Sequence, residues 1–225
     1  MPSLSKQLHK ASYDFFKANN EDFTTDSGAV APTYTSEGVS LAVTTDSTNS
    51  VIYQNDLLFF DIDLVKRVEF LFKPKDLDAD SVIHLGMASD YNSDPTATAA
   101  HAFLKILGDG TVTAETDDGT NDLSELLEYT VTSNAWHRAS IDFSAGVQSI
   151  SPPGSSIGGK GSVQFSISES GTNRHAARMT KHMDMSNYSA GLQILCNAAL
   201  SGSTASPSAG VIIQRIEVEH ELPNS

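Results

Sequence analysis

The chain has 225 residues, of which 39% are hydrophobic and 19% charged, so it is long enough to bury a sizeable core in one large β domain or two small domains. Its 28 acidic residues outnumber its 14 Lys and Arg residues, and the resulting net charge of −14 argues against nucleic-acid binding because it repels phosphate groups. A single cysteine, Cys196, excludes an internal disulfide.

The first twenty residues predict a helical arm. Ser3 is a suitable N-cap, and a helix over residues 3–19 would end at Asn19 and Asn20. The apolar residues fall at roughly helical spacing and would form one stripe: Leu4, Leu8, Ala11, Phe15 and Phe16. Such a stripe needs a surface to lie on, which is either the rest of the chain or another protein.

From residue 21 onward the pattern changes to short alternating runs separated by polar turns. In residues 65–74, Val68, Phe70 and Phe72 alternate with Arg67, Glu69 and Leu71. Residues 101–116 predict a hairpin that turns at Gly108-Asp109-Gly110. The other expected strands cover residues 51–60, 81–89, 128–132, 136–143, 162–170, 191–200 and 210–222. About ten strands without further helices indicate one antiparallel sandwich or barrel over residues 21–225.

The stretch "NAWHRASIDFSAG" (134–146) contains the only tryptophan, Trp136. In a strand, His137 would share one face with Ala139, Ile141 and Phe143, which predicts that this face is buried and that His137 belongs to the scaffold.

Four stretches together resemble the laminin-G and concanavalin A-like family over residues 45–222. They are "WHRASIDF", the hairpin "FLKILGDGTVTAET", "VEFLFKPKDLDADSVIHLGMAS" and the final "VIIQRIEVEHEL". The resemblance implies an all-β, antiparallel, two-sheet jelly-roll sandwich, here with a short N-terminal helix. Similar domains occur in structural proteins of tailed phages.

Three aspartates, Asp76, Asp78 and Asp80, alternate as in calcium loops, but Ser81 and Met87 stand where an EF-hand needs Gly and Glu. The family resemblance implies that a calcium site at the rim of the sandwich is an alternative to a solvated turn, and no other cofactor is expected. A second acidic loop contains Glu115, Asp117, Asp118 and Asp122, and we interpret it as an exposed loop rather than a metal site.

No catalytic set is complete. "GSSIG" (154–158) places Ser156 in a G-x-S-x-G pattern but lacks the strand and helix of a nucleophile elbow. Glu217, Glu219 and Glu221 alternate as glycosidase carboxylates do, without the intervening Asp. Arg67, Glu69 and His84 are similar to part of the alginate-lyase pattern, without its second Arg and its Gln. We therefore expect a protein that is not an enzyme.

Residues 172–185, "TNRHAARMTKHMDM", form the one basic, Met-rich segment of an acidic chain, which suits an adaptable contact with an acidic neighbour. Together with the N-terminal stripe, it supplies the expected partner-contact residues: Leu4, Leu8, Phe15, Phe16, Arg174, His175, Arg178, Met179, Lys181 and His182.

These features predict a structural protein of a virion, a decoration or cement protein that binds the major capsid protein as a homo-oligomer, with a trimer favoured. The N-terminus shows no signal peptide and no apolar run reaches the ~18 residues of a membrane span, so we expect cytoplasmic synthesis and no membrane partner. The alternatives are a calcium-dependent, lectin-like glycan-binding module or a tail-associated adhesion protein, and then a polysaccharide lyase or glycosidase.

Overall fold

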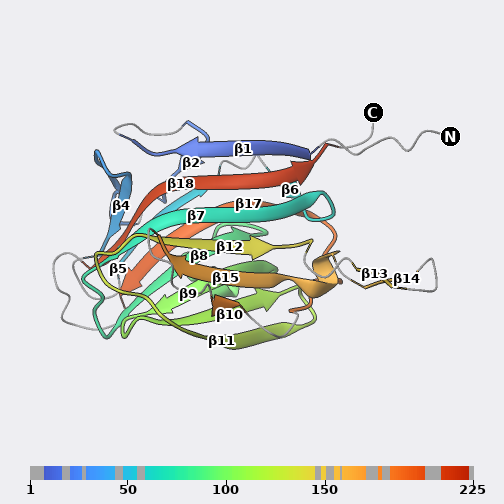
Figure 1. Ribbon diagram of the computed structural model, residues 1–225. Helices are drawn as coiled ribbons and strands as arrows, with labels where there is room; N and C mark the ends of the chain where they lie inside the picture. The colour runs from blue at the N-terminus through green and yellow to red at the C-terminus, as the bar shows by residue number, and fades with distance from the viewer. Residues whose placement is uncertain are drawn as a thin grey trace.

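The computed structural model describes residues 8–16, 21–26, 29–43, 48–54, 59–144, 148–150, 155–157, 159–170, 177–178, 183–200 and 209–222. Two antiparallel sheets pack face to face (Figure 1), as the predicted all-β, two-sheet sandwich requires. The helical content of the described residues is two short 3₁₀ segments, Pro95–Ala97 and Gly159–Ser162.

Sheet A faces the viewer in Figure 1 and contains eight described strands. In spatial order they are β16 (Ala177–Arg178), β15 (Gln164–Glu169), β12 (His137–Asp142), β7 (Val65–Lys75), β18 (Gly210–Glu221), β4 (Val39–Ala42) and β3 (Thr33–Tyr34). The eighth strand, β1 (Leu8–Asp14), pairs with β18.

Sheet B lies behind sheet A and also contains eight described strands. They run in the order β11 (Asp122–Thr130), β10 (Thr111–Asp117), β9 (His101–Leu107), β8 (Ser81–Ala88), β17 (Gly191–Leu200), β5 (Thr48–Gln54) and β2 (Phe23–Thr24), with β6 (Phe60–Asp61) on β17. A separate ribbon of β13 (Gln148–Ile150) and β14 (Ser155–Ile157) projects beyond the sandwich in Figure 1.

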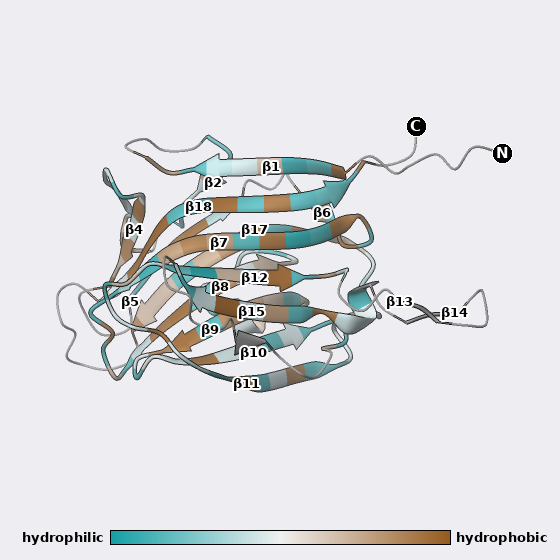
Figure 2. Cartoon of the chain, in the orientation of Figure 1, coloured by the Kyte–Doolittle hydropathy of each residue, from teal (hydrophilic) through white to brown (hydrophobic). Residues whose placement is uncertain are grey.

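The core lies between the sheets because apolar residues alternate with polar ones along the strands (Figure 2). Val68, Phe70 and Phe72 of β7 are fully buried, as their spacing predicts. They belong to one apolar cluster with Ile83 and Leu85 of sheet B. Burial of a side chain of this size contributes about 1.5–3 kcal/mol, so this shared cluster holds the two sheets together.

The predicted helix over residues 3–19 is wrong in the part that the structure describes. Leu8–Asp14 forms strand β1, which pairs along its whole length with β18. Tyr13 and Phe15 are buried, whereas Ser12, Asp14 and Phe16 are exposed. This period of two matches a strand, and the free edge of β18 supplies the hydrogen bonds that a helix would otherwise make within itself.

The predicted hairpin is confirmed, since β9 pairs with β10 and the amide of Gly110 donates to the carbonyl of Leu107 over 2.8 Å. Gly110 has a φ of +85°, and an added Cβ would lie 2.8 Å from the Val131 carbonyl oxygen, so this turn requires glycine.

Within the part of the chain that is described, no helix is long and apolar enough to cross a membrane.

Candidate functional site

The outward surface of sheet A is polar because alternate residues of its strands point away from the core. On β7, for example, Phe70 lies between the outward residues Glu69 and Leu71, is fully buried and points inward. We define the polar face as the outward residues of β1, β18, β7 and β12: Lys10, Ser12, Asp14, Arg215, Glu217, Glu219, Arg67, Glu69, Leu71, Arg138, Ser140 and Asp142.

Two carboxylates lie side by side at the centre of the polar face. Glu69 of β7 is directly opposite Glu217 of β18, and Ser140 of β12 is opposite Glu69 on the other side. Directly opposed residues have Cβ atoms roughly 4.5–5.5 Å apart, and two like charges in such positions repel each other. The pair therefore needs compensation by cations.

Three cations supply that compensation. Arg67 Nη2 lies 2.7 Å from one carboxylate oxygen of Glu69, and Arg138 Nη1 binds the other oxygen. Lys10 Nζ lies 2.8 Å from Glu217 Oε2, and this hydrogen bond raises the pKa of the Lys10 ammonium. The side chains of Glu69 and Glu217 are 16% and 18% exposed, so both carboxylates are partly open to solvent.

A fourth cation, Arg215, lies beside the pair. Its Nε donates to Asp14 Oδ1 over 2.6 Å, and this bond raises the pKa of the guanidinium. Its Nη1 is 3.9 Å from Glu217 Oε1. The carboxylate pair is thus surrounded by four cationic side chains, from β1, β7, β12 and β18.

The surface is hollowed around the pair. One hollow of about 260 Å³ is lined by Lys10, Glu69, Leu71, Arg138, Arg215 and Glu217. A neighbouring hollow of about 140 Å³ is lined by Lys10, Arg67, Glu69, Arg138, Glu217 and Glu219. A smaller one, of about 80 Å³, lies over Ser140 and Ser166, whose hydroxyl oxygens are 2.7 Å apart. The first two hollows share Lys10, Glu69, Arg138 and Glu217, and the third shares Arg67 with the second.

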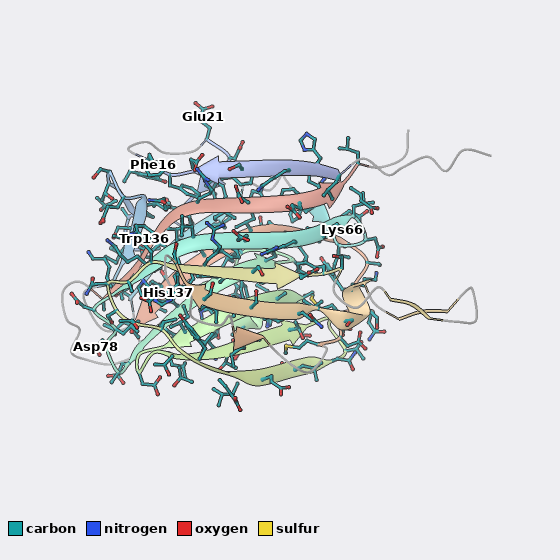
Figure 3. All side chains as sticks on the ribbon, in the orientation of Figure 1. Phe16, Glu21, Lys66, Asp78, Trp136 and His137 are labelled. Carbon is teal, nitrogen blue, oxygen red and sulfur yellow. The ribbon has the colours of Figure 1, made fainter. Side chains whose placement is uncertain are left out.

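Trp136 and His137 stand at the start of β12, at one end of sheet A (Figure 3). His137 is fully buried; the Tyr129 hydroxyl lies 3.0 Å from its Nδ1 and the Thr132 carbonyl 3.1 Å from its Nε2. Burial lowers the pKa of this imidazole. The histidine is part of the scaffold, as predicted. Trp136 is half-buried, and the Lys73 ammonium lies 5.1 Å from the centroid of its ring.

The three aspartates predicted to bind calcium do not converge. Asp76 accepts a hydrogen bond of 3.2 Å from the Asn134 amide, and Asp78 accepts one of 3.3 Å from the backbone amide of Asp80. Among the described residues, no group of three or more His, Cys, Asp or Glu side chains could hold a metal ion. The calcium site stays a prediction.

The residues of the second predicted acidic loop lie mostly in strands, with Glu115 and Asp117 in β10, Asp122 in β11 and Asp118 in the turn between them. Glu115 pairs with Lys105 over 3.0 Å. Asp118 is buried rather than exposed, and its carboxylate accepts hydrogen bonds from the backbone of Thr120, Asn121 and Asn187. Burial opposes the ionisation of Asp118, but these hydrogen bonds outweigh it and lower its pKa to about 2. This carboxylate joins two loops.

The residues of the alginate-lyase pattern are divided between the sheets. Arg67 and Glu69 lie on the polar face, whereas His84 lies on β8 of sheet B. Glu217 and Glu219 line the hollows, and Glu221 pairs with Lys66 over 3.3 Å. Ser156 lies in β14, a strand of the ribbon, and its side chain is outside the described part.

The predicted partner-contact residues have different environments. Leu8 and Phe16 are 57% and 45% exposed, whereas Phe15 is fully buried, so Phe15 cannot contact a partner as predicted. Arg178 lies in β16, and its side chain is not described. The others lie outside the described residues: Leu4, Arg174, His175, Met179, Lys181 and His182.

Sequence reasoning missed the pairing of Glu69 with Glu217 and the roles of Lys10, Arg138 and Arg215. The only signal in the sequence is the alternation of charged with apolar residues in residues 67–70 and 215–219. That alternation predicts an outward charged face on each strand, but it does not say which strands are neighbours.

No protein-family model and no curated protein sequence matches this chain. Solved structures do match in fold. An apo Crh5 transglycosylase has a TM-score of 0.66 at 12% identity, over 96% of this chain and 85% of its own. A winged bean acidic lectin complexed with methyl-α-D-galactose has a TM-score of 0.66 at 9% identity, over 97% and 100%. The catalytic domain of an endo-1,3-β-glucanase (laminarinase) from Thermotoga petrophila has a TM-score of 0.61 at 10% identity, over 97% and 100%.

The expectation that this protein is not an enzyme is contradicted, because a transglycosylase and a glucanase match it over nearly its whole length. An incomplete catalytic motif in the sequence was insufficient ground for that expectation, since catalytic side chains in a sandwich come from strands far apart in the chain. These matches do not bear on the expected similarity to structural proteins of tailed phages. The sheet order and the matches together show that the chain folds as a two-sheet jelly-roll sandwich, like the lectin and the glucanase.

Proposed function

We propose that this protein recognises a glycan on the polar face of sheet A. The observation that carries the proposal is the pair of partly exposed carboxylates, Glu69 and Glu217, held side by side by cations over adjoining hollows. Carboxylates and cationic side chains suit the hydroxyl groups of a sugar, since each hydroxyl both donates and accepts hydrogen bonds. Trp136 adds an aromatic surface at one end of the same sheet face.

The architecture is compatible with this proposal. The lectin that matches it was crystallised with methyl-α-D-galactose, and the glucanase and transglycosylase are named for reactions on glycans. These likenesses concern the fold, so the proposal rests on the residues of the polar face.

Glycoside hydrolysis or transfer is the second candidate, and the same pair favours it. Retaining glycosidases use two carboxyl groups about 5–5.5 Å apart, one as nucleophile and one as general acid, and opposed residues such as Glu69 and Glu217 can reach that spacing. Both carboxylates are held by neighbouring cations, however, an arrangement that positions them to accept hydrogen bonds from a ligand. Recognition is therefore the better-supported function.

The test compares Glu69→Gln and Glu217→Gln with the wild-type protein on a glycan array, followed by titration calorimetry with the glycans that bind. We expect each variant to lose at least about 10-fold in affinity, since a hydrogen bond to a charged group contributes roughly 1.5–3 kcal/mol. Glu115→Gln is the matched control: this glutamate is 14% exposed and ion-paired to Lys105, but it lies in sheet B.

Reducing-sugar release from the same glycans separates the two candidates. Hydrolysis lost in both variants would favour the enzyme, and binding without release would favour a lectin-like protein. Equal affinity of wild type and both variants for every glycan would contradict the proposed site. A parallel series with chelator and with added calcium tests the predicted site at Asp76, Asp78 and Asp80.

The virion-decoration hypothesis, with its capsid partner, homotrimer and location in the particle, stays a separate prediction. The exposed apolar side chains of Leu8 and Phe16, near the two ends of β1, are available for a contact with a shell protein. Cosedimentation of the chain with large particles from its native source, in a fixed ratio to a shell protein, would support it. A chain that stays in the supernatant would contradict it.

A further inference from the structure

The larger hollow on the polar face has an apolar floor between two arginines. Leu71 of β7 is paired with Arg215 of β18 on one side and with Arg138 of β12 on the other. All three residues line the hollow of about 260 Å³. Neighbouring strands are about 4.8 Å apart, so the backbones that carry the two arginines are separated by roughly twice that distance.

The lining of this hollow carries more positive than negative charge. Its cations are Lys10, Arg138 and Arg215, and its carboxylates are Glu69 and Glu217. This balance is unusual in a chain with a net charge of −14. All the arginines whose side chains are described, Arg67, Arg138 and Arg215, point outward from sheet A.

The two arginines keep donors for a ligand. Arg138 uses Nη1 to bind Glu69, and its side chain is 52% exposed. Arg215 uses Nε to bind Asp14, and its side chain is 44% exposed. A guanidinium group has five N–H donors in a rigid plane, so these ion pairs leave a part of each fork directed to solvent.

We propose that this hollow is a subsite for a uronic acid residue of an acidic glycan. A sugar carboxylate fits the guanidinium fork of Arg138 or Arg215, because its two coplanar oxygens accept two parallel hydrogen bonds. Leu71 packs against the apolar C–H face of the ring, and Glu69 and Glu217 accept hydrogen bonds from its hydroxyl groups. This inference rests on the proposed glycan recognition and specifies its substrate class.

The experiment measures the affinity of the full chain for polygalacturonate and for the same polymer after reduction of its carboxyl groups. We expect the acidic polymer to bind at least about 10-fold more tightly, which corresponds to the loss of one charge-assisted hydrogen-bonded pair. The affinity for the acidic polymer should fall as NaCl is raised, whereas that for the reduced polymer should change little.

The variants Arg138→Gln and Arg215→Gln should each lose most of this preference. Arg138→Lys and Arg215→Lys keep the charge but not the fork, so we expect them to restore less than half of the lost free energy. Lys105→Gln is the control, because it removes one charge from an ion pair on sheet B. Thermal melting of every variant confirms that the fold is retained.

Three results would overturn the subsite. Equal affinity for the acidic and the reduced polymer would show that the carboxylate is not recognised, while leaving the proposed glycan recognition intact. Tighter binding of dextran sulfate than of polygalacturonate, or full rescue by lysine, would indicate that only charge is recognised. If neither polymer and no glycan of the array binds to the wild-type protein, the proposed function itself fails, and the variants then have no affinity to lose.

Discussion

His84 is a buried histidine whose surroundings disfavour the protonated imidazole. It is 5% exposed on β8, and Asn197 of β17 is directly opposite it. Neither ring nitrogen of His84 makes a hydrogen bond of ordinary geometry, and the nearby Asn197 side chain favours the protonated ring only weakly. Burial, with a smaller effect of the nearby Lys105 charge, lowers the pKa of His84 to about 3. The folded protein therefore keeps this imidazole neutral at neutral and mildly acidic pH.

We predict that this histidine makes stability depend on pH. In the unfolded chain His84 binds a proton below about pH 6.5, whereas in the folded protein it does so only near pH 3. The free energy of unfolding should therefore fall as the pH falls, by about 2 kcal/mol between pH 7 and pH 5 from this residue alone. Urea unfolding at both pH values checks this, with His84→Gln as the comparison.

The variant cannot take up the proton, so its stability should change less between the two pH values. An identical change in wild type and His84→Gln would show that His84 does not carry the effect. Carboxyl groups protonate mainly below pH 5, which is why the comparison stops there.

At the scale of the element, β1 gives two adjacent phenylalanines opposite environments. The amide of Phe15 donates to the carbonyl of Gln214 over 3.1 Å, which extends the pairing with β18 beyond Asp14. The Phe15 ring packs edge-on against Phe23 at a centroid distance of 5.1 Å. Phe16 points to solvent and is 45% exposed. The strand thus fixes which of two chemically equal neighbours stabilises the core.

The two positions form a matched pair for mutation. Phe15→Ala should lower the free energy of unfolding by about 3–5 kcal/mol, since it leaves a cavity in the core. Phe16→Ala should change it by less than about 0.5 kcal/mol. Urea unfolding of both variants is the measurement. Comparable effects of the two substitutions would contradict the strand, because a helical stripe would place both rings on a similar surface.

The contrast between prediction and structure at this scale has a physical cause. The alternation of Val68, Phe70 and Phe72, and the buried face of His137, could be predicted because strand period is a local property of the sequence. β1 could not, because a short amphipathic segment adopts the conformation that its neighbour offers, and here that neighbour is β18. The opposition of Glu69 and Glu217 depends on which strands pair, and no local pattern contains that information.

At the scale of the whole molecule, one apolar cluster joins both sheets. The chain carries one natural probe in each: Trp136 at the start of β12 in sheet A, and the buried Cys196 of β17 in sheet B. Burial raises the pKa of the Cys196 thiol, which makes it unreactive in the folded state. The two sheets can thus be followed independently.

We predict that they unfold together. In increasing urea, the fluorescence of Trp136 and the labelling of Cys196 by a thiol reagent should give the same midpoint, since neither sheet can keep its inner face out of water alone. Circular dichroism supplies a third, global probe. Separate midpoints for the two residues would show that one sheet survives without the other, and would divide the sandwich into two cooperative units.

The central positions of β17 and β18 have a consequence for biosynthesis. Strand β8 pairs with β17, and β7 pairs with β18, so each of these early strands gains its partner only after the other described strands of the sandwich have been made. Until residues 210–221 have left the exit tunnel, a nascent chain presents unpaired edges of β7 and β4 to its surroundings. The sandwich therefore cannot close before β17 and β18 have been made, and nascent chains that lack these two strands are the copies most exposed to mispairing with one another.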